Sequence, residues 1–271
     1  MMALEQVAQG GLVLLGCGKM GSALLAGWLA AGLPATSVWV LEPHPSDWLK
    51  STGVHLNSET PASPAVLLLA VKPQMMGSAL PALQAMGNGK TLVVSIAAGT
   101  SIATFEQVFG AETPIVRTMP NTPAMVGRGI TGICANSRAG AEGLALAAEL
   151  MRAVGEVVEL EGEHQIDAVT ALSGGGPAYV FHLIEAMAAG GVAMGLAPEV
   201  AMKLARVTVC GAGELAWRAP ETAAQLRINV TSPGGTTAAA LAHLMDAETG
   251  LPPLMERALK AAAARGAELG K

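Results

Sequence analysis

The chain has 271 residues, of which 51% are hydrophobic and 14% charged, and its net charge is −5 at pH 7. This apolar content excludes a disordered chain, and the negative balance argues against a nucleic-acid partner, which would need a basic surface. The three cysteines are scattered along the chain, so neither a disulfide scaffold nor a metal site is expected.

The first part of the chain gives no sign of membrane insertion or secretion. Its longest uncharged run lies between Lys19 and Glu42, and Gly32 and Pro34 interrupt it. The helix left before this break has about a dozen residues, too few to cross a bilayer. No basic segment precedes an apolar one at the start, unlike a signal peptide. We therefore expect a cytoplasmic protein with no membrane partner.

Residues 1–162 alternate short apolar runs with helical stretches. Strands are expected at 12–15, 38–41, 65–71, 91–96, 114–117, 130–134 and 156–160, and helices at 19–31, 75–86 and 139–154. Apolar strands separated by helices indicate a parallel sheet that is covered on both faces. The predicted fold class is therefore α/β, with a doubly wound, mostly parallel sheet.

Residues 163–271 have no strand-like runs and form a second predicted domain. Helices are expected at 164–172, 178–195, 198–217, 236–244 and 252–269. Several of them are apolar around most of their circumference, and a small bundle cannot bury so much apolar surface by itself. We therefore expect an all-helical domain that packs against a second copy, giving a homodimer or a larger assembly.

A glycine-rich element follows the first predicted strand and opens the first predicted helix. It has the pattern G-x-G-x-x-G and consists of Gly16, Cys17, Gly18, Lys19, Met20 and Gly21. In this context the pattern is typical of a Rossmann-type dinucleotide site, because the helix amino terminus faces the pyrophosphate. The alternative is an ordinary strand-turn-helix with glycines for packing. We favour dinucleotide binding.

Glu42 stands at the end of the second predicted strand, where a carboxylate binds the ribose hydroxyls of NAD. No arginine follows it, and only His44, Ser46 or Lys50 is available to meet the extra phosphate of NADP. These residues favour NAD, and the alternative is that Glu42 is a solvated loop carboxylate.

Further polar and small residues follow the next strands. They are Ala70, Val71, Lys72 and Pro73, then Ala97 and Ala98, and finally Asn121. The carboxyl ends of parallel strands form the ligand crevice, so we expect these residues at the cofactor. Lys72 could contact the cofactor or be a surface lysine. Asn121 could orient a ring or an amide, or it could brace its own turn.

One loop of the helical part carries hydroxyl groups and glycines, namely Ser232, Gly234, Gly235, Thr236 and Thr237. Free backbone N–H groups at the start of the following helix could hold a carboxylate. On spacing alone, we favour the alternative that Ser232 caps the helix with Pro233 in its first turn. No nucleophile elbow or metal cluster is visible, so a cofactor is expected to carry the chemistry.

Together these elements resemble pyrroline-5-carboxylate reductase over nearly the whole chain. The shared blocks are G-C-G-K-M-G, A-V-K-P, S-I-A-A-G, R-T-M-P-N-T-P, D-A-V-T-A-L-S-G-G-G-P-A-Y and V-T-S-P-G-G-T-T, the last being close to diagnostic. The chain departs from the family pattern at Gly175, where serine is usual, and around Glu221.

The resemblance implies reduction of 1-pyrroline-5-carboxylate to L-proline with NADPH or NADH, the last step of proline biosynthesis. It implies that an amino-terminal Rossmann domain binds the cofactor and that the helical domain dimerises, often building decamers. The loop before residue 238 would clamp the substrate carboxylate, with the Thr237 hydroxyl near the imine nitrogen as the catalytic contact. Each active site would then draw on both subunits. The resemblance favours NADPH, which members of the family usually use, whereas Glu42 favours NADH.

Three other interpretations compete with this one. A β-hydroxyacid dehydrogenase would need a lysine on the predicted helix 178–195, which has none. A non-enzymatic NAD(P)-sensing regulatory protein of the same fold would bind cofactor without turnover. A purely structural dimerisation module would leave the crevice motifs without a purpose.

Overall fold

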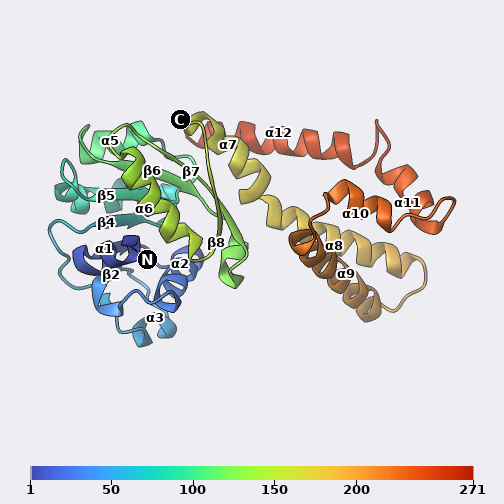
Figure 1. The fold of residues 1–271 in the computed structure, drawn as a ribbon, viewed down its shortest axis with the longest axis horizontal. Coiled ribbons are helices and arrows are strands. Elements are labelled where there is room, and N and C mark those ends of the chain that lie inside the picture. Colours follow the sequence, from blue (N-terminus) through green and yellow to red (C-terminus); the bar gives the residue numbers. More distant parts are fainter. Residues whose placement is uncertain (1, 271) are drawn as a thin grey trace. The chain divides into compact units, whose positions relative to one another are not determined.

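An eight-stranded sheet organises the first part of the chain in the computed structural model, which describes residues 2–270 (Figure 1). The strands are β1 (Leu12–Leu15), β2 (Val38–Leu41), β3 (His55–Leu56), β4 (Val66–Leu69), β5 (Leu92–Ser95), β6 (Ile115–Met119), β7 (Gly129–Ala135) and β8 (Gly155–Glu159). Their order is β3-β2-β1-β4-β5-β6-β7-β8, and neighbouring strands are parallel except for β6 and β7. The predicted mostly parallel α/β sheet is confirmed.

Helices cover both faces of this sheet because the side chains of each strand alternate between two cores. On one face, Leu12 and Leu14 of β1 belong to the core built with α1 (Met2–Gly10), α2 (Lys19–Ala30) and α6 (Gly140–Arg152). On the other face, Val13 and Leu15 belong to the core built with α4 (Pro73–Ala79) and α5 (Ile102–Phe109). The sheet is therefore doubly wound, as predicted.

Strands β7 and β8 run opposite to the other six. Only a short connection containing the 3-10 segment η3 (Thr122–Val126) separates β6 from β7. A parallel crossover needs a dozen or more residues, so this connection can only return the chain antiparallel to β6. The longer α6 then permits a parallel crossover from β7 to β8. The strand positions were predictable here, but the reversal of direction was not recognised.

Two predicted helices differ in detail from the structure. The helix expected at 75–86 is α4 followed by a 3-10 segment, η2 (Leu80–Met86), because Pro81 cannot donate a helical hydrogen bond. The helix expected at 164–172 consists of η4 (Glu163–Gln165), α7 (Ile166–Val169) and a π-helical turn, η5 (Thr170–Gly174). The elements without a prediction were α1, η1 (Ala35–Ser37), α3 (Asp47–Ser51), β3, α5, η3 and α10 (Ala223–Asn229).

The chain divides into two compact units. The sheet unit runs up to Gly175 and also includes the chain from Ala262 onward, and the helical unit is Gly176–Ala261. Residues after 162 stay with the sheet because Ile166 packs with Met119 and Cys134 in a small core. The prediction instead divided the chain into domains at 1–162 and 163–271, where the strand pattern ends, and that boundary stays a prediction.

The helical unit leaves much apolar surface exposed. It contains α8 (Gly176–Ala193), α9 (Pro198–Arg218), α10, α11 (Thr236–Leu244) and the first part of α12 (Leu251–Leu269) (Figure 1). Its buried core is the contact of α8 with α9 through Ala188, Ala201 and Ala205. Large side chains such as Phe181 and Val207 stay more than half exposed. None of the described helices combines the length and the apolar character that a membrane span needs.

Candidate functional site

The glycine-rich element connects β1 to α2, and two of its glycines are required by packing. Gly16 has a φ of +89°, and a Cβ there would meet Val71 Cγ1 at 2.8 Å. A Cβ on Gly21 would lie 2.5 Å from the carbonyl oxygen of Gly16. Larger residues at either position would force the loop away from β4 or away from α2.

Gly18 differs from these two because space surrounds it. A Cβ there would meet no atom within 4 Å, and its φ of −70° suits any residue. Gly18 is the N-cap of α2, and no side chain caps the helix. The first backbone N–H groups of α2 therefore have no helical partners and carry the positive end of the helix dipole. An open approach to such amides is what a pyrophosphate requires, so this loop fits a dinucleotide.

The carboxylate of Glu42 points back at this loop from the end of β2. Its Oε2 accepts a hydrogen bond of 2.8 Å from the backbone N–H of Cys17, and its Oε1 accepts one of 3.0 Å from His44. Burial, with a smaller contribution from Glu42, raises the pKa of the Cys17 thiol to about 11. The thiol is therefore protonated at pH 7, and Glu42 supplies the negative charge beside the loop.

The residues predicted after β4 and β5 lie at the same edge of the sheet as the glycine loop. β1 pairs with β4 and β4 with β5, so that Leu15, Leu69 and Ser95 are neighbours. Just beyond them, Lys72 is exposed and is the N-cap of α4, whose first residue is Pro73. Ala97 is buried in the core, whereas Ala98 is half-buried. The structure therefore brings together these parts of the predicted cofactor set.

Asn121 is held by backbone groups on both sides of its amide. Its Oδ1 accepts from the backbone N–H of Ile130 at 3.0 Å, and its Nδ2 donates to the carbonyl of Ser173 at 3.1 Å. These bonds join the end of β6 to the start of β7 and to the π-helical turn η5. The side chain therefore joins distant segments and does not cap the turn η3 that Asn121 begins, and its role at the cofactor stays a prediction.

A buried ion pair in the sheet unit was not predicted from the sequence. Arg117 of β6 lies inside the sheet unit, and its Nη1 donates to Glu163 Oε1 at 2.6 Å. The same oxygen accepts from the backbone N–H of Ile102 at 2.7 Å, at the start of α5. This carboxylate therefore links a strand, a helix amino terminus and η4. Glu163 carried no signal in the sequence because it is 46 positions from its partner.

The predicted substrate loop forms the amino terminus of α11 in the helical unit. Gly235 is the N-cap of this helix, and no side chain caps it. Gly234 has a φ of +68°, which turns the chain into the helix, and the N–H of Gly235 donates to the carbonyl of Ser232 at 3.0 Å. The first-turn amides of Thr236 and Thr237 are left without helical partners. An anion such as a carboxylate fits this arrangement.

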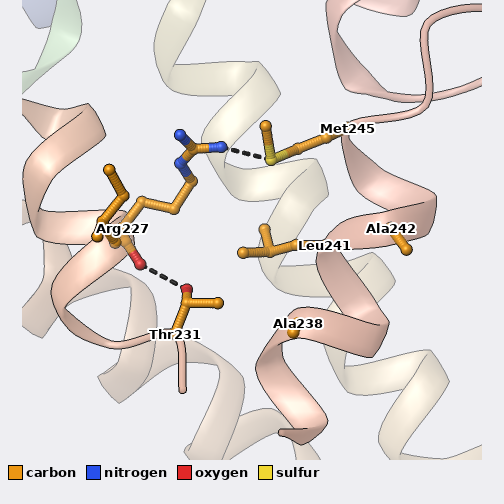
Figure 2. Close-up of a pocket in the computed structure, with 7 residues that line it drawn as sticks. Arg227, Thr231, Ala238, Leu241, Ala242 and Met245 are labelled. Carbon is orange, nitrogen blue, oxygen red and sulfur yellow. Dashed lines mark hydrogen bonds between the residues drawn. The ribbon is translucent and has the colours of Figure 1, made fainter. Parts of the chain in front are cut away.

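A cavity of about 530 Å³ lies in the helical unit between α10 and α11 (Figure 2). It is lined by Arg227, Ile228, Thr231, Ala238, Leu241, Ala242 and Met245. The guanidinium of Arg227 donates to the sulfur of Met245, and the Thr231 hydroxyl donates to the Arg227 carbonyl at 2.6 Å (Figure 2). Ser232 and residues 234–237 do not line it, so this cavity is distinct from the predicted substrate loop.

Two family descriptions match the chain. Residues 163–269 match the family described as pyrroline-5-carboxylate reductase dimerisation. Residues 12–99 match the family described as NADP oxidoreductase, coenzyme F420-dependent. The first match covers the helical part and begins at the residue that opens the predicted second domain, and the second covers the glycine loop and the strand ends after it.

Similar proteins extend over nearly the whole chain. A pyrroline-5-carboxylate reductase from Synechocystis sp. is 44% identical, over 96% of this chain and 98% of that protein. The solved structure of a pyrroline-5-carboxylate reductase from Coxiella burnetii is 36% identical, with a TM-score of 0.90 over 97% of this chain and 99% of that one. Plasmodium falciparum pyrroline carboxylate reductase, solved with NADP bound, is 30% identical, with a TM-score of 0.82 over 96% and 98%.

Proposed function

Since this chain belongs to the pyrroline-5-carboxylate reductase family, we propose that it reduces 1-pyrroline-5-carboxylate to L-proline with NAD(P)H. The observation that carries this proposal is the open approach at Gly18 to the uncapped amino terminus of α2. This cradle lies at the edge of the sheet where β4 and β5 end, which is where a doubly wound sheet binds its ligand.

The cofactor site consists of the residues at this edge. The backbone of residues 16–21 holds the pyrophosphate, Glu42 faces the ribose, and the segments 70–73 and 97–98 border the nicotinamide side, with Asn121 behind them. When bound, NAD(P)H supplies the hydride that reduces the C=N bond. Small side chains at Ala70 and Ala98, both half-buried, leave the backbone accessible to a flat ring, which positions the ring for transfer, and Ala97 lies in the core beneath them.

The substrate site is the amino terminus of α11. Backbone N–H groups of Thr236 and Thr237 hold the substrate carboxylate, and Ser232, Gly234 and Gly235 shape the turn that presents them. The Thr237 hydroxyl hydrogen-bonds the imine nitrogen and does not act as a base. A protonated imine that accepts a hydride at carbon becomes a neutral secondary amine, so the chain needs to supply no further proton for this step.

Removing the Thr237 hydroxyl tests this assignment. Thr237→Ala is expected to lower kcat/KM about tenfold, the cost of one hydrogen bond to a charged group. The Kd for NAD(P)H and the thermal midpoint should not change, because Thr237 is only half-buried. Thr237→Ser, which keeps the hydroxyl, should restore the rate. Equal kcat/KM in Thr237→Ala and the parent enzyme would remove Thr237 from the mechanism.

Self-association of the chain is supported by the dimerisation family that its helical part matches. The proposed assembly is a homodimer, from which decamers are built. Exposed apolar side chains such as Phe181 and Val207 would be covered in it. Light scattering on the protein as it elutes from a size-exclusion column measures the mass directly. A monomer at micromolar concentration would contradict the dimer.

We propose the cytoplasm as the location of the protein.

The reaction itself is tested by the loss of absorbance at 340 nm when 1-pyrroline-5-carboxylate is added with NADH and, in parallel, with NADPH. Turnover with either cofactor supports the reductase. Cofactor binding without turnover would overturn it and favour a non-enzymatic NAD(P)-sensing protein of the same fold.

A further inference from the structure

The side chain of Glu42 is fixed where the two nicotinamide cofactors differ, at the ribose that carries either a free 2′-hydroxyl or a 2′-phosphate. Glu42 is the first residue beyond β2, whose last residue, Leu41, pairs with Leu15 of β1. The N–H of Gly16 donates to the Leu41 carbonyl at 2.9 Å, which ties the glycine loop to this strand end. In sheets of this kind a carboxylate here hydrogen-bonds the ribose hydroxyls, whereas an arginine accommodates the phosphate.

The Glu42 carboxylate is held by the protein and does not extend into solvent. Each of its oxygens accepts one backbone hydrogen bond, at 2.8 Å from Cys17 and 3.0 Å from His44. A carboxylate oxygen has a second acceptor position, so both oxygens can still accept a ribose hydroxyl. A phosphate offers no such donor when ionised, and its charge would lie beside that of Glu42.

The backbone of Glu42 is clamped as well. Its N–H donates to Asn57 Oδ1 at 2.8 Å, and its carbonyl accepts from Asn57 Nδ2 at 2.9 Å. Asn57 follows the short strand β3 and has a φ of +49°, and its own N–H donates to the carbonyl of Val40 at 2.9 Å. Asn57 therefore fixes where the Glu42 side chain begins, and the carboxylate can turn away from a second negative group only by breaking its two bonds from Cys17 and His44.

The loop after Glu42 offers little free positive charge to neutralise a 2′-phosphate. The Ser46 hydroxyl oxygen caps α3 by accepting from the N–H of Leu49 at 3.2 Å, so this side chain could offer a phosphate one neutral O–H donor but no positive charge. The ammonium group of Lys50 pairs with Asp47 at 2.9 Å, which adds a second carboxylate to the same loop. Lys19 begins α2, where its charge would attract the pyrophosphate of either cofactor equally. Of the three side chains in this loop that were considered for the phosphate, only the His44 ring has no such partner.

We propose that Glu42, with its backbone held by Asn57 and its carboxylate by the amides of Cys17 and His44, makes this chain bind NADH in preference to NADPH. The inference rests on the proposed function, since it concerns the cofactor of that same site.

Equilibrium titration of cofactor fluorescence, without substrate, tests the preference in the full-length protein. The wild-type Kd for NADPH should exceed that for NADH by about tenfold or more, equivalent to about 1.4 kcal/mol. Glu42→Gln keeps the shape and an acceptor for Cys17 but removes the charge, so the ratio of the two Kd values should fall at least fivefold. Glu59→Gln, which removes an exposed carboxylate elsewhere on the sheet unit, is the matched control and should keep the wild-type ratio.

Salt gives a second readout, because screening weakens a repulsion between charges. For the wild-type protein, the ratio of the NADPH Kd to the NADH Kd should fall as the salt concentration rises from 20 mM to 500 mM. For Glu42→Gln, this ratio should not change with salt. A wild-type protein that binds NADPH as tightly as NADH, or a Glu42→Gln variant with the wild-type ratio, would overturn the proposal. The wild-type ratio decides the matter alone if the variant fails to fold. Failure to bind either cofactor would instead contradict the proposed function.

Discussion

Replacing Gly18 with valine is expected to weaken NAD(P)H binding about 100-fold, or about 2.7 kcal/mol, while the fold survives. The expected loss is large because the new side chain would fill the space through which a pyrophosphate reaches the first amides of α2. The fold survives because a Cβ at Gly18 meets no atom within 4 Å and the φ of −70° is ordinary for valine.

The thermal midpoint with and without NADH separates these two effects. A cofactor at 100 times its Kd stabilises a protein by about 2.7 kcal/mol, which raises the midpoint of a chain of this size by several degrees. The Gly18→Val variant should keep the unliganded midpoint and lose this rise. Gly77→Ala is the control, because Gly77 also faces open space but lies within α4. A normal rise with Gly18→Val would show that the pyrophosphate binds elsewhere.

Gly21→Ala is expected to behave differently from Gly18→Val. Its Cβ would lie 2.5 Å from the Gly16 carbonyl, so the backbone of the loop must move. The variant should lose stability as well as cofactor binding, and a fall in the unliganded midpoint would demonstrate it.

Replacing Glu163 with alanine is expected to destabilise the protein by about 3 kcal/mol. The substitution leaves the buried Arg117 guanidinium without its carboxylate and removes the acceptor for the Ile102 amide at the start of α5. The value lies at the low end for a broken buried pair because the Glu163 side chain is 33% exposed and water can enter.

Thermal unfolding at a fixed protein concentration measures this loss, and a fall of about 6 to 12 °C is expected. Glu161→Ala is the matched control, since it removes an exposed carboxylate two positions away. Glu163→Gln retains an acceptor for Ile102 and should be intermediate. A midpoint for Glu163→Ala equal to that of the control would mean that the pair contributes nothing to stability.

The sheet and the glycine loop were predictable because their signals are local. Uninterrupted apolar runs such as residues 12–15 predict buried strands, and three glycines at the spacing of Gly16, Gly18 and Gly21 predict a tight turn into a helix. The short elements were not predicted because they are too short to give such a local signal. β3 has two residues, and α10 has seven, so neither shows a complete hydrophobic period.

In the candidate site, too, features with a local signal could be predicted and long-range contacts could not. The residue types at the strand ends, including Glu42 and Asn121, could be selected from the sequence because parallel strands place their carboxyl ends together. Their partners could not be selected. Asn57 hydrogen-bonds the backbone of Glu42 although the two residues are 15 positions apart. Glu163 pairs with Arg117 although 46 positions separate them.

The sequence by itself determined the α/β class, the doubly wound sheet, the glycine loop and the helical second part, because each depends on the spacing of residues a few positions apart. Only the tertiary structure decided that β7 turns back beside β6, that the Asn121 amide bonds the backbone of Ile130 and Ser173, and that Glu42 is held against the Cys17 amide. These features depend on which distant segments meet. A hydrogen bond between them leaves no periodic pattern in either segment, so its donor and acceptor become visible only when the chain has folded.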